Sequence, residues 1–119
     1  MKLKISDIIE LLQAEVLTQP SEAILTSELS VSFASDLMSD VLAYVNEDVL
    51  LITGLAHVQV LRTCEMLDIN VVLCTRGKPI NEEMIELANQ TEILLLQTAL
   101  TTYEVCGILY KVGFKGVTL

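Results

Sequence analysis

Positive charge is scarce in this chain of 119 residues. Lysine and arginine together number 7, against 16 aspartate and glutamate residues, which gives a formal net charge of −9. Aromatic residues make up only 4% of the sequence, and no basic stripe runs along it. Proteins bind nucleic acids and anionic membranes mainly through clustered lysine and arginine. The composition therefore argues against both classes of partner.

Long apolar runs are also missing, although hydrophobic residues make up 52% of the chain and the mean hydropathy is +0.57. The longest run, around EILLLQTAL, is too short to span a bilayer and is typical of a buried strand. The first residues, MKLKISDIIELL, form an acidic amphipathic segment where a signal peptide would need an apolar core. We therefore expect a cytoplasmic protein.

The chain length indicates one domain that spans residues 1–119, because there is too little chain for a catalytic and a regulatory domain together. A small domain has much surface for its volume, so this much apolar sequence cannot all be hidden inside one copy. An apolar patch left on the surface usually marks an interface. We expect a homodimer.

Three cysteines, Cys64, Cys74 and Cys106, are an odd number at wide spacing. Each lies within an apolar pattern, which favours reduced thiols in the core over disulfide bonds or a metal site. The sequence predicts no metal site and no cofactor.

Helical and strand periodicities alternate along the first half of the chain. Apolar residues at helical spacing predict an N-terminal helix capped by Ser6 and a later helix capped by Ser35 or Asp36. Between these helices, Pro20 blocks helix formation, and the segment AILTSELSVSF is typical of short β structure with a polar break.

From residue 49 onward the pattern is regular. Three apolar strands, VLLIT, NVVLCT and EILLLQT, each end in threonine, and each is followed by a helical stripe. Strands that are apolar on both faces are typical of a parallel sheet covered by helices and joined by right-handed crossovers. The predicted fold class is α/β, with a mostly parallel sheet of about four to five strands in a three-layer arrangement.

The strand-ending threonines, Thr53, Thr75 and Thr98, lie 22 and 23 residues apart, so all three reach the carboxyl edge of the predicted sheet. Ligands bind at this edge in open α/β sheets. Threonine hydroxyls, helix N-termini and two cations suit an anion such as an adenine nucleotide. If the segment before residue 49 joins the sheet in parallel, Ser35 and Asp36 lie there too. The candidate ligand-binding residues are Ser35, Asp36, Thr53, Gly54, His57, Thr75, Arg76, Gly77, Lys78 and Thr98.

Each candidate residue also has a structural interpretation. A threonine between a strand and a helix is commonly a helix cap, and Gly54 can simply supply a tight turn. TGLAHVQ matches neither the G-x-G-x-x-G nor the P-loop pattern. His57 at a helix start is typically structural, and Asp36 with Asp40 is more typical of capping than of cation binding. Gly107, inside a helical pattern, indicates close backbone packing at a subunit contact.

Ordered segments between about Ser32 and Gly113 resemble the DRTGG-domain family. They are SFASDLMSDVLAYV, LLITGLAHVQVLRTCEMLDI, VVLCTRGKP and IELANQTEILLLQTALTTYEVCGILYKVG. This family is similar to the N-terminal domain of HPr kinase/phosphorylase. The resemblance implies a stand-alone regulatory α/β module that tends to dimerise and acts on a metabolic enzyme. The string Asp-Arg-Thr-Gly-Gly itself is absent, and the resemblance supplies no catalytic residue.

Three functions are compatible with these patterns. The first is a non-catalytic regulatory module that senses a small anion at the carboxyl edge. The second is a protein-interaction or assembly subunit without a small-molecule ligand, whose apolar surface includes the C-terminal GFKGVTL. The third is a small enzyme that uses Asp36, Asp40 or His57. It ranks last, because the sequence assembles no nucleophile, base and oxyanion site.

Overall fold

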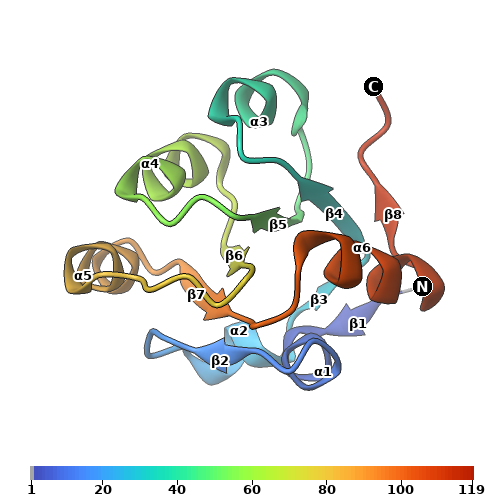
Figure 1. Cartoon of the computed structure of the whole chain (residues 1–119), viewed down its shortest axis with the longest axis horizontal. Helices are drawn as coiled ribbons and strands as arrows, with labels where there is room; N and C mark the ends of the chain where they lie inside the picture. Colours follow the sequence, from blue (N-terminus) through green and yellow to red (C-terminus); the bar gives the residue numbers. More distant parts are fainter. Residues whose placement is uncertain (1) are drawn as a thin grey trace.

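The computed structural model describes residues 2–119 and places most of the strands in one sheet (Figure 1). This six-stranded sheet has the order β2-β7-β6-β5-β4-β8, in which β2 alone is antiparallel to its neighbour. Its strands are β2 Glu15–Val16, β4 Val31–Ala34, β5 Leu50–Thr53, β6 Val71–Cys74, β7 Leu94–Gln97 and β8 Lys115–Gly116. The strands β1 Leu3–Lys4 and β3 Glu28–Leu29 form a separate antiparallel pair.

Helices cover both faces of this sheet. They are α1 Ile5–Leu11, α2 Glu22–Thr26, α3 Met38–Tyr44, α4 Val58–Leu67, α5 Glu82–Gln90 and α6 Thr102–Lys111. In Figure 1, α3, α4 and α5 lie along one side of the sheet, while α1 and α6 lie on the other. The chain therefore has the predicted α/β class and three-layer arrangement.

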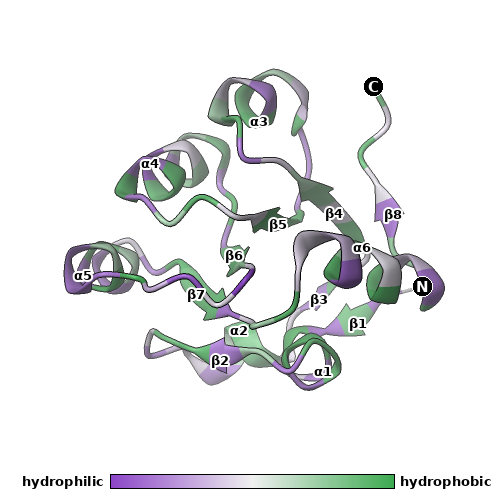
Figure 2. Cartoon of the chain, viewed as in Figure 1, coloured by the Kyte–Doolittle hydropathy of each residue, from purple (hydrophilic) through white to green (hydrophobic). Residues whose placement is uncertain are grey.

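The alternation of side chains along each strand explains the two cores. In β5, Leu51 packs among the residues of α3, α4 and α5, whereas Leu50 and Ile52 pack among those of α1 and α6. All four residues of β5 are buried, as are all four of β6. Because these strands are buried on both faces, their sequences are continuous apolar runs. Figure 2 shows the resulting concentration of hydrophobic residues in the central strands.

The sheet has more strands than the sequence predicts, because β2 and β8 contain only two residues each. Their side chains are exposed, so no apolar run marks them. Both lie at an edge of the sheet, where short strands limit unwanted pairing with other chains.

Two predicted helix caps are wrong. The first helix begins at Ile5, one residue before Ser6, because Ile5 is fully buried and its N–H donates to the Ser27 carbonyl at 2.9 Å. The third helix begins after Leu37, and no side chain caps it. The Ser35 hydroxyl accepts a hydrogen bond from the Leu37 N–H at 3.0 Å, which shapes the turn before the helix instead.

The expected β structure of AILTSELSVSF is only partly correct. Its first residues belong to the short helix α2, whose N-terminus is capped by the Ser21 hydroxyl through the Ile24 N–H at 3.2 Å. Pro20 lies just before this cap, where no helical N–H is required, so it does not prevent the helix. The strands β3 and β4 follow as predicted.

The three cysteines are free thiols, and Cys64 and Cys74 are buried in the core. Burial raises the pKa of Cys64 to about 12, with a smaller contribution from Cys74, and burial raises the pKa of Cys74 to about 11. Cys106 is half-buried, and burial raises the pKa of its thiol as well. Two of the three thus occupy the core positions that the sequence predicts.

Among residues 2–119, no helix is long and apolar enough to cross a membrane.

Candidate functional site

The carboxyl edge of the sheet gathers the loops that follow β4, β5, β6 and β7. Strand β4 runs parallel to β5, with Ser32 opposite Leu50 and Ala34 opposite Ile52. Ser35 and Asp36 follow β4 directly, so they lie at the same edge as Thr53 and Gly54. The segment before residue 49 thus joins the sheet in parallel, which is the arrangement under which Ser35 and Asp36 were expected to lie at this edge.

Asp36 joins two of these loops. Its Oδ1 accepts a hydrogen bond from the Thr53 hydroxyl at 3.1 Å and another from the Gly54 N–H at 2.6 Å. The Thr53 hydroxyl in turn accepts from the Leu55 N–H at 3.1 Å. The carboxylate therefore fastens the β4–α3 loop to the β5–α4 loop, which is a different role from the predicted helix cap.

Gly54 leaves room for the side chain of Arg76. Its φ lies outside the left-handed region, so the backbone conformation does not itself demand a glycine. A Cβ atom at this position would lie 2.7 Å from Nη2 of Arg76. That nitrogen donates to the Gly54 carbonyl at 3.2 Å. The missing side chain thus lets the guanidinium lie directly on the backbone of the β5–α4 loop.

The β6–α5 loop holds Arg76 in an uncommon conformation. Arg76 has φ +69° and Gly77 has φ +61°, and two consecutive positive values are typical of a tight type I′ turn. A non-glycine residue in this region costs roughly 1–2 kcal/mol. Two backbone hydrogen bonds secure the turn: the Arg76 N–H donates to Leu100 O at 2.8 Å, and the Gly77 N–H donates to Thr98 O at 2.9 Å. The Lys78 carbonyl also accepts from the Gln97 side-chain amide.

The three strand-ending threonines are buried and bind protein groups. The Thr98 hydroxyl donates to the Leu12 carbonyl at 2.8 Å, and the Thr75 hydroxyl lies 2.7 Å from that of Thr102. None of the three caps a helix, so that alternative interpretation was wrong. They connect the sheet edge to neighbouring loops and to the end of α1, which leaves their hydroxyls little capacity for a ligand.

His57 begins α4, as the structural interpretation expected. Its Nδ1 accepts the Gln59 N–H at 3.0 Å and so caps the helix. The imidazole is part of an exposed residue, and it shares no hydrogen bond with Asp36. Thr101 caps α6 in the same way, with Glu104 completing a capping box.

A model of the DRTGG domain matches residues 7–112 of the chain. The chain belongs to the DRTGG-domain family. A similar solved structure contains the CBS and DRTGG domains of the regulatory region of Clostridium perfringens pyrophosphatase, complexed with an activator, diadenosine tetraphosphate. The two chains share 19% identity and superpose with a TM-score of 0.73 over 89% of this chain and 45% of the other, which establishes the fold. Comparison with curated proteins finds no match.

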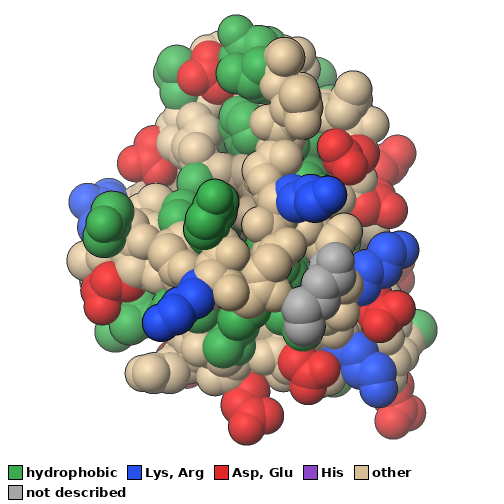
Figure 3. Space-filling model, turned by 90° about the vertical axis from the view of Figure 1, so that its right-hand side faces the viewer, with side chains coloured by type: hydrophobic (Ala, Val, Ile, Leu, Met, Phe, Trp, Pro, Cys, Tyr) green, Lys and Arg blue, Asp and Glu red, His purple; other side chains and the backbone are tan. Residues whose placement is uncertain are grey.

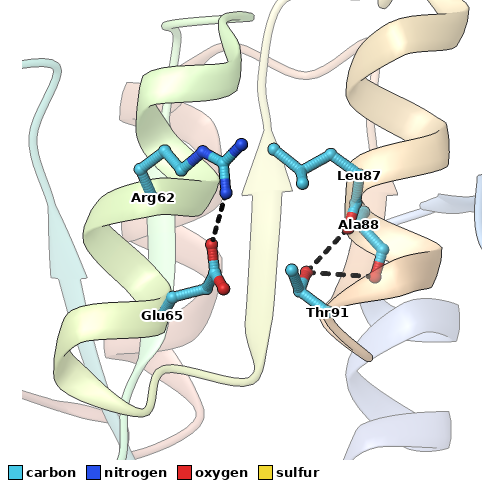
Figure 4. A network of polar contacts seen from close by, with 5 residues as sticks. All are labelled: Arg62, Glu65, Leu87, Ala88 and Thr91. Carbon is cyan, nitrogen blue, oxygen red and sulfur yellow. Dashed lines mark hydrogen bonds and ion pairs between the residues drawn. The ribbon is translucent and has the colours of Figure 1, made fainter.

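Arg76 and Lys78 of this DRTGG domain are exposed at its carboxyl edge. A single ion pair forms within residues 2–119, between Arg62 and Glu65 on α4 at 3.2 Å (Figure 4). Across from it, the Thr91 hydroxyl at the end of α5 donates to the Leu87 carbonyl at 2.8 Å (Figure 4). Arg76 and Lys78 therefore have no carboxylate partner in the described part of the chain. No cluster of three potential metal-ligating side chains occurs there either.

A cavity of about 540 Å³ lies at the opposite, amino edge of the sheet. Its lining includes Gln19, Asn70, Asn89 and Glu92, which sequence reasoning did not select. Isolated amides in polar loops carry no spacing signal, because three distant segments bring them together. The DRTGG domain thus has a charged surface at one edge and a cavity at the other.

Proposed function

We propose that this DRTGG domain is a non-catalytic regulatory module that senses a small anion, such as an adenine nucleotide, at its carboxyl edge. In this proposal the domain acts as a dimer on a metabolic enzyme. The observation that carries the proposal is Arg76, which is held in a strained conformation with its guanidinium exposed beside Gly54. Strained backbone of this kind is concentrated at ligand-binding sites.

The charge around Arg76 supports an anionic ligand. One guanidinium nitrogen donates to the Gly54 carbonyl, while the other donors have no partner in residues 2–119. Lys78 is exposed two residues further along. Guanidinium groups bind phosphate with two parallel hydrogen bonds, and a nearby ammonium adds a point charge. In a chain with net charge −9, this pair is the natural position for an anion.

The similar solved structure supports the regulatory part of the proposal. Its DRTGG domain belongs to the regulatory region of a pyrophosphatase, and the complex contains a nucleotide activator. The hydrogen bonds that Asp36 and His57 make within the protein support the proposal that the domain is not a catalyst. Asp36 already accepts two hydrogen bonds, and Nδ1 of His57 caps a helix. These groups are not arranged as an acid and base that share a substrate.

Ligand-dependent thermal unfolding tests the proposal. We expect ATP, ADP, diadenosine tetraphosphate, pyrophosphate or phosphate to raise the unfolding midpoint in a concentration-dependent manner. A ligand at 100 times its Kd stabilises the native state by about 2.7 kcal/mol, which shifts the midpoint of a domain this size by several degrees. Arg76→Ala should abolish the shift. Arg62→Ala is the matched control, because Arg62 is also exposed but lies on α4. A flat response of the wild-type protein across the panel would contradict anion sensing.

The assembly subunit is a second candidate because α6 presents an unusual surface. Tyr103 and Tyr110 are 88% and 83% exposed, and both lie on the same face of α6 as Gly107. A Cβ at Gly107 would meet no atom within 4 Å, so packing inside this chain does not require the glycine. Figure 3 views the side of the molecule where both termini lie, and hydrophobic side chains are interspersed there with charged ones. This candidate predicts a dimer that no anion stabilises and that Tyr110→Glu dissociates in sedimentation experiments.

A further inference from the structure

We propose that the cavity at the amino edge of the sheet is a second binding site, which takes an uncharged nucleoside. The cavity has a volume of about 540 Å³. Small-molecule sites typically measure about 300–1,000 Å³, so the space suits a ligand of nucleoside size. It lies at the edge opposite Arg76, and the inference does not depend on the proposed anion site.

The cavity is open to solvent, and its walls come from parts of the chain that are distant in sequence. One wall is the segment after β2 together with α2, and the other is formed by the end of α5 and the starts of β6 and β7. Ile24 of α2 supplies a half-buried apolar wall, and Ile93 and Leu94 form the floor with their side chains buried beneath it. Apolar walls of this type favour a flat ring that can leave water on both faces.

Three side-chain amides surround this floor. The side chains of Gln19 and Asn70 make no hydrogen bond with another residue in the range 2–119. Oδ1 of Asn89 accepts from the Gln19 N–H at 3.0 Å, which leaves the amide nitrogen available. An amide offers a donor and an acceptor side by side, which is the pattern that asparagine and glutamine use to pair with the edge of a base.

The charges around the cavity disfavour a phosphate. Its lining contains no lysine or arginine, and its one ionisable residue is Glu92. An adjoining hollow of about 130 Å³ shares Ile24, Ser27 and Asn70 with the cavity, and it adds Glu28, Asp48 and Asp68. A phosphate would meet repulsion from these carboxylates without a compensating cation. A ribose suits Glu92, because a carboxylate accepts hydrogen bonds from ribose hydroxyls.

Nuclear magnetic resonance of the side-chain amides tests this inference. Adenosine, guanosine, cytidine and uridine are titrated separately into the full chain. We expect one of them to shift the side-chain amide signals of Gln19, Asn70 and Asn89 and to saturate. Asn70→Ala should weaken the affinity about tenfold, the effect of losing one or two hydrogen bonds to the base. Asn46→Ala is the matched control, since Asn46 is an exposed asparagine outside the lining.

Several results would overturn the inference. It is wrong if no nucleoside shifts these signals at millimolar concentration, or if spermidine shifts them and nucleosides do not. It is also wrong if a nucleoside binds with the same affinity to Asn70→Ala, to Glu92→Gln and to the wild-type protein, because binding would then be elsewhere. Arg76→Ala separates the two sites: it should leave nucleoside affinity unchanged while abolishing the response to anions. Either site can therefore fail without the other.

Discussion

Replacement of Asp36 by alanine should destabilise the protein by about 2 kcal/mol. The carboxylate accepts hydrogen bonds from the Thr53 hydroxyl and the Gly54 N–H, at 3.1 and 2.6 Å. Thr53 and Gly54 are buried, so water cannot easily replace the carboxylate as the hydrogen-bond partner of these two donors. A hydrogen bond to a charged group contributes about 1.5–3 kcal/mol. Asp36 itself is exposed, and solvent screening lowers this contribution to about 1 kcal/mol for each bond.

Urea unfolding measures this loss. The transition midpoint should fall by about 1 M with an unchanged slope, because the surface exposed on unfolding stays the same. Asp36→Asn keeps an acceptor oxygen and should lose less than half as much. Asp40→Ala is the matched control, because Asp40 is an acid four residues further along that makes no side-chain hydrogen bond within residues 2–119. Its loss should stay within about 0.5 kcal/mol, the usual helix-dipole contribution.

The reasoning would be refuted if Asp36→Ala and Asp40→Ala were equally stable. In that case water would replace the carboxylate without cost, and Asp36 would not hold the two loops together. A large loss in Asp36→Asn equal to that in Asp36→Ala would indicate instead that the negative charge, rather than the hydrogen-bond geometry, is what the site requires.

Three further predictions concern other parts of the fold. Thr98→Val should cost about 1–2 kcal/mol in urea unfolding, because it removes the buried bond to the Leu12 carbonyl; an unchanged midpoint would contradict this role. Gly107→Ala should raise the thermal midpoint by the equivalent of about 0.5–1 kcal/mol, unless a partner helix needs the space, in which case it should weaken association in sedimentation experiments. The raised pKa values of Cys64 and Cys74, about 12 and 11, mean that the folded state retains protons which the unfolded state releases above pH 9. Stability should therefore fall from pH 9 toward pH 12, and the double alanine variant should show a smaller fall in unfolding free energy over this range.

The central part of the fold is predictable from sequence because its strands are buried on both faces. Strands β5, β6 and β7 appear as apolar runs, and each ends at or next to the predicted threonine. Residues 14–34 are much less predictable. The strand β2 is held by edge pairing with β7 and by the bond from Leu17 N–H to Leu95 O at 2.9 Å, with partners about eighty residues away. The short helix α2 packs against α1.

The position of the candidate residues at one edge of the sheet was predictable, but the contacts that each residue makes were not. All strand-ending residues reach the expected edge, because parallel strands end on one side of a sheet. Whether a hydroxyl binds a ligand or the protein depends on what lies opposite it. Thr98 meets a carbonyl of α1, and Thr53 meets Asp36, and neither contact has a sequence signal. The contact between Gly54 and Arg76 is hidden for the same reason, since 22 residues separate its partners.

The hydrogen bonds at the carboxyl edge indicate how the proposed anion site could transmit its state. A phosphate that binds Nη1 and Nη2 of the Arg76 guanidinium through two parallel hydrogen bonds competes with the Gly54 carbonyl for Nη2. Gly54 is bonded through its N–H to Asp36, which leads directly into α3. A ligand at Arg76 would thus release one side of the Gly54 peptide while the other remains tied to the β4–α3 loop. A ligand shifts a conformational equilibrium only if it binds the two conformations with different affinities, and the loss of the bond between Arg76 and Gly54 would distinguish them. Hydrogen exchange at the Gly54 and Leu55 amides, with and without the anion, should increase if this coupling exists and should stay unchanged if the ligand only neutralises surface charge.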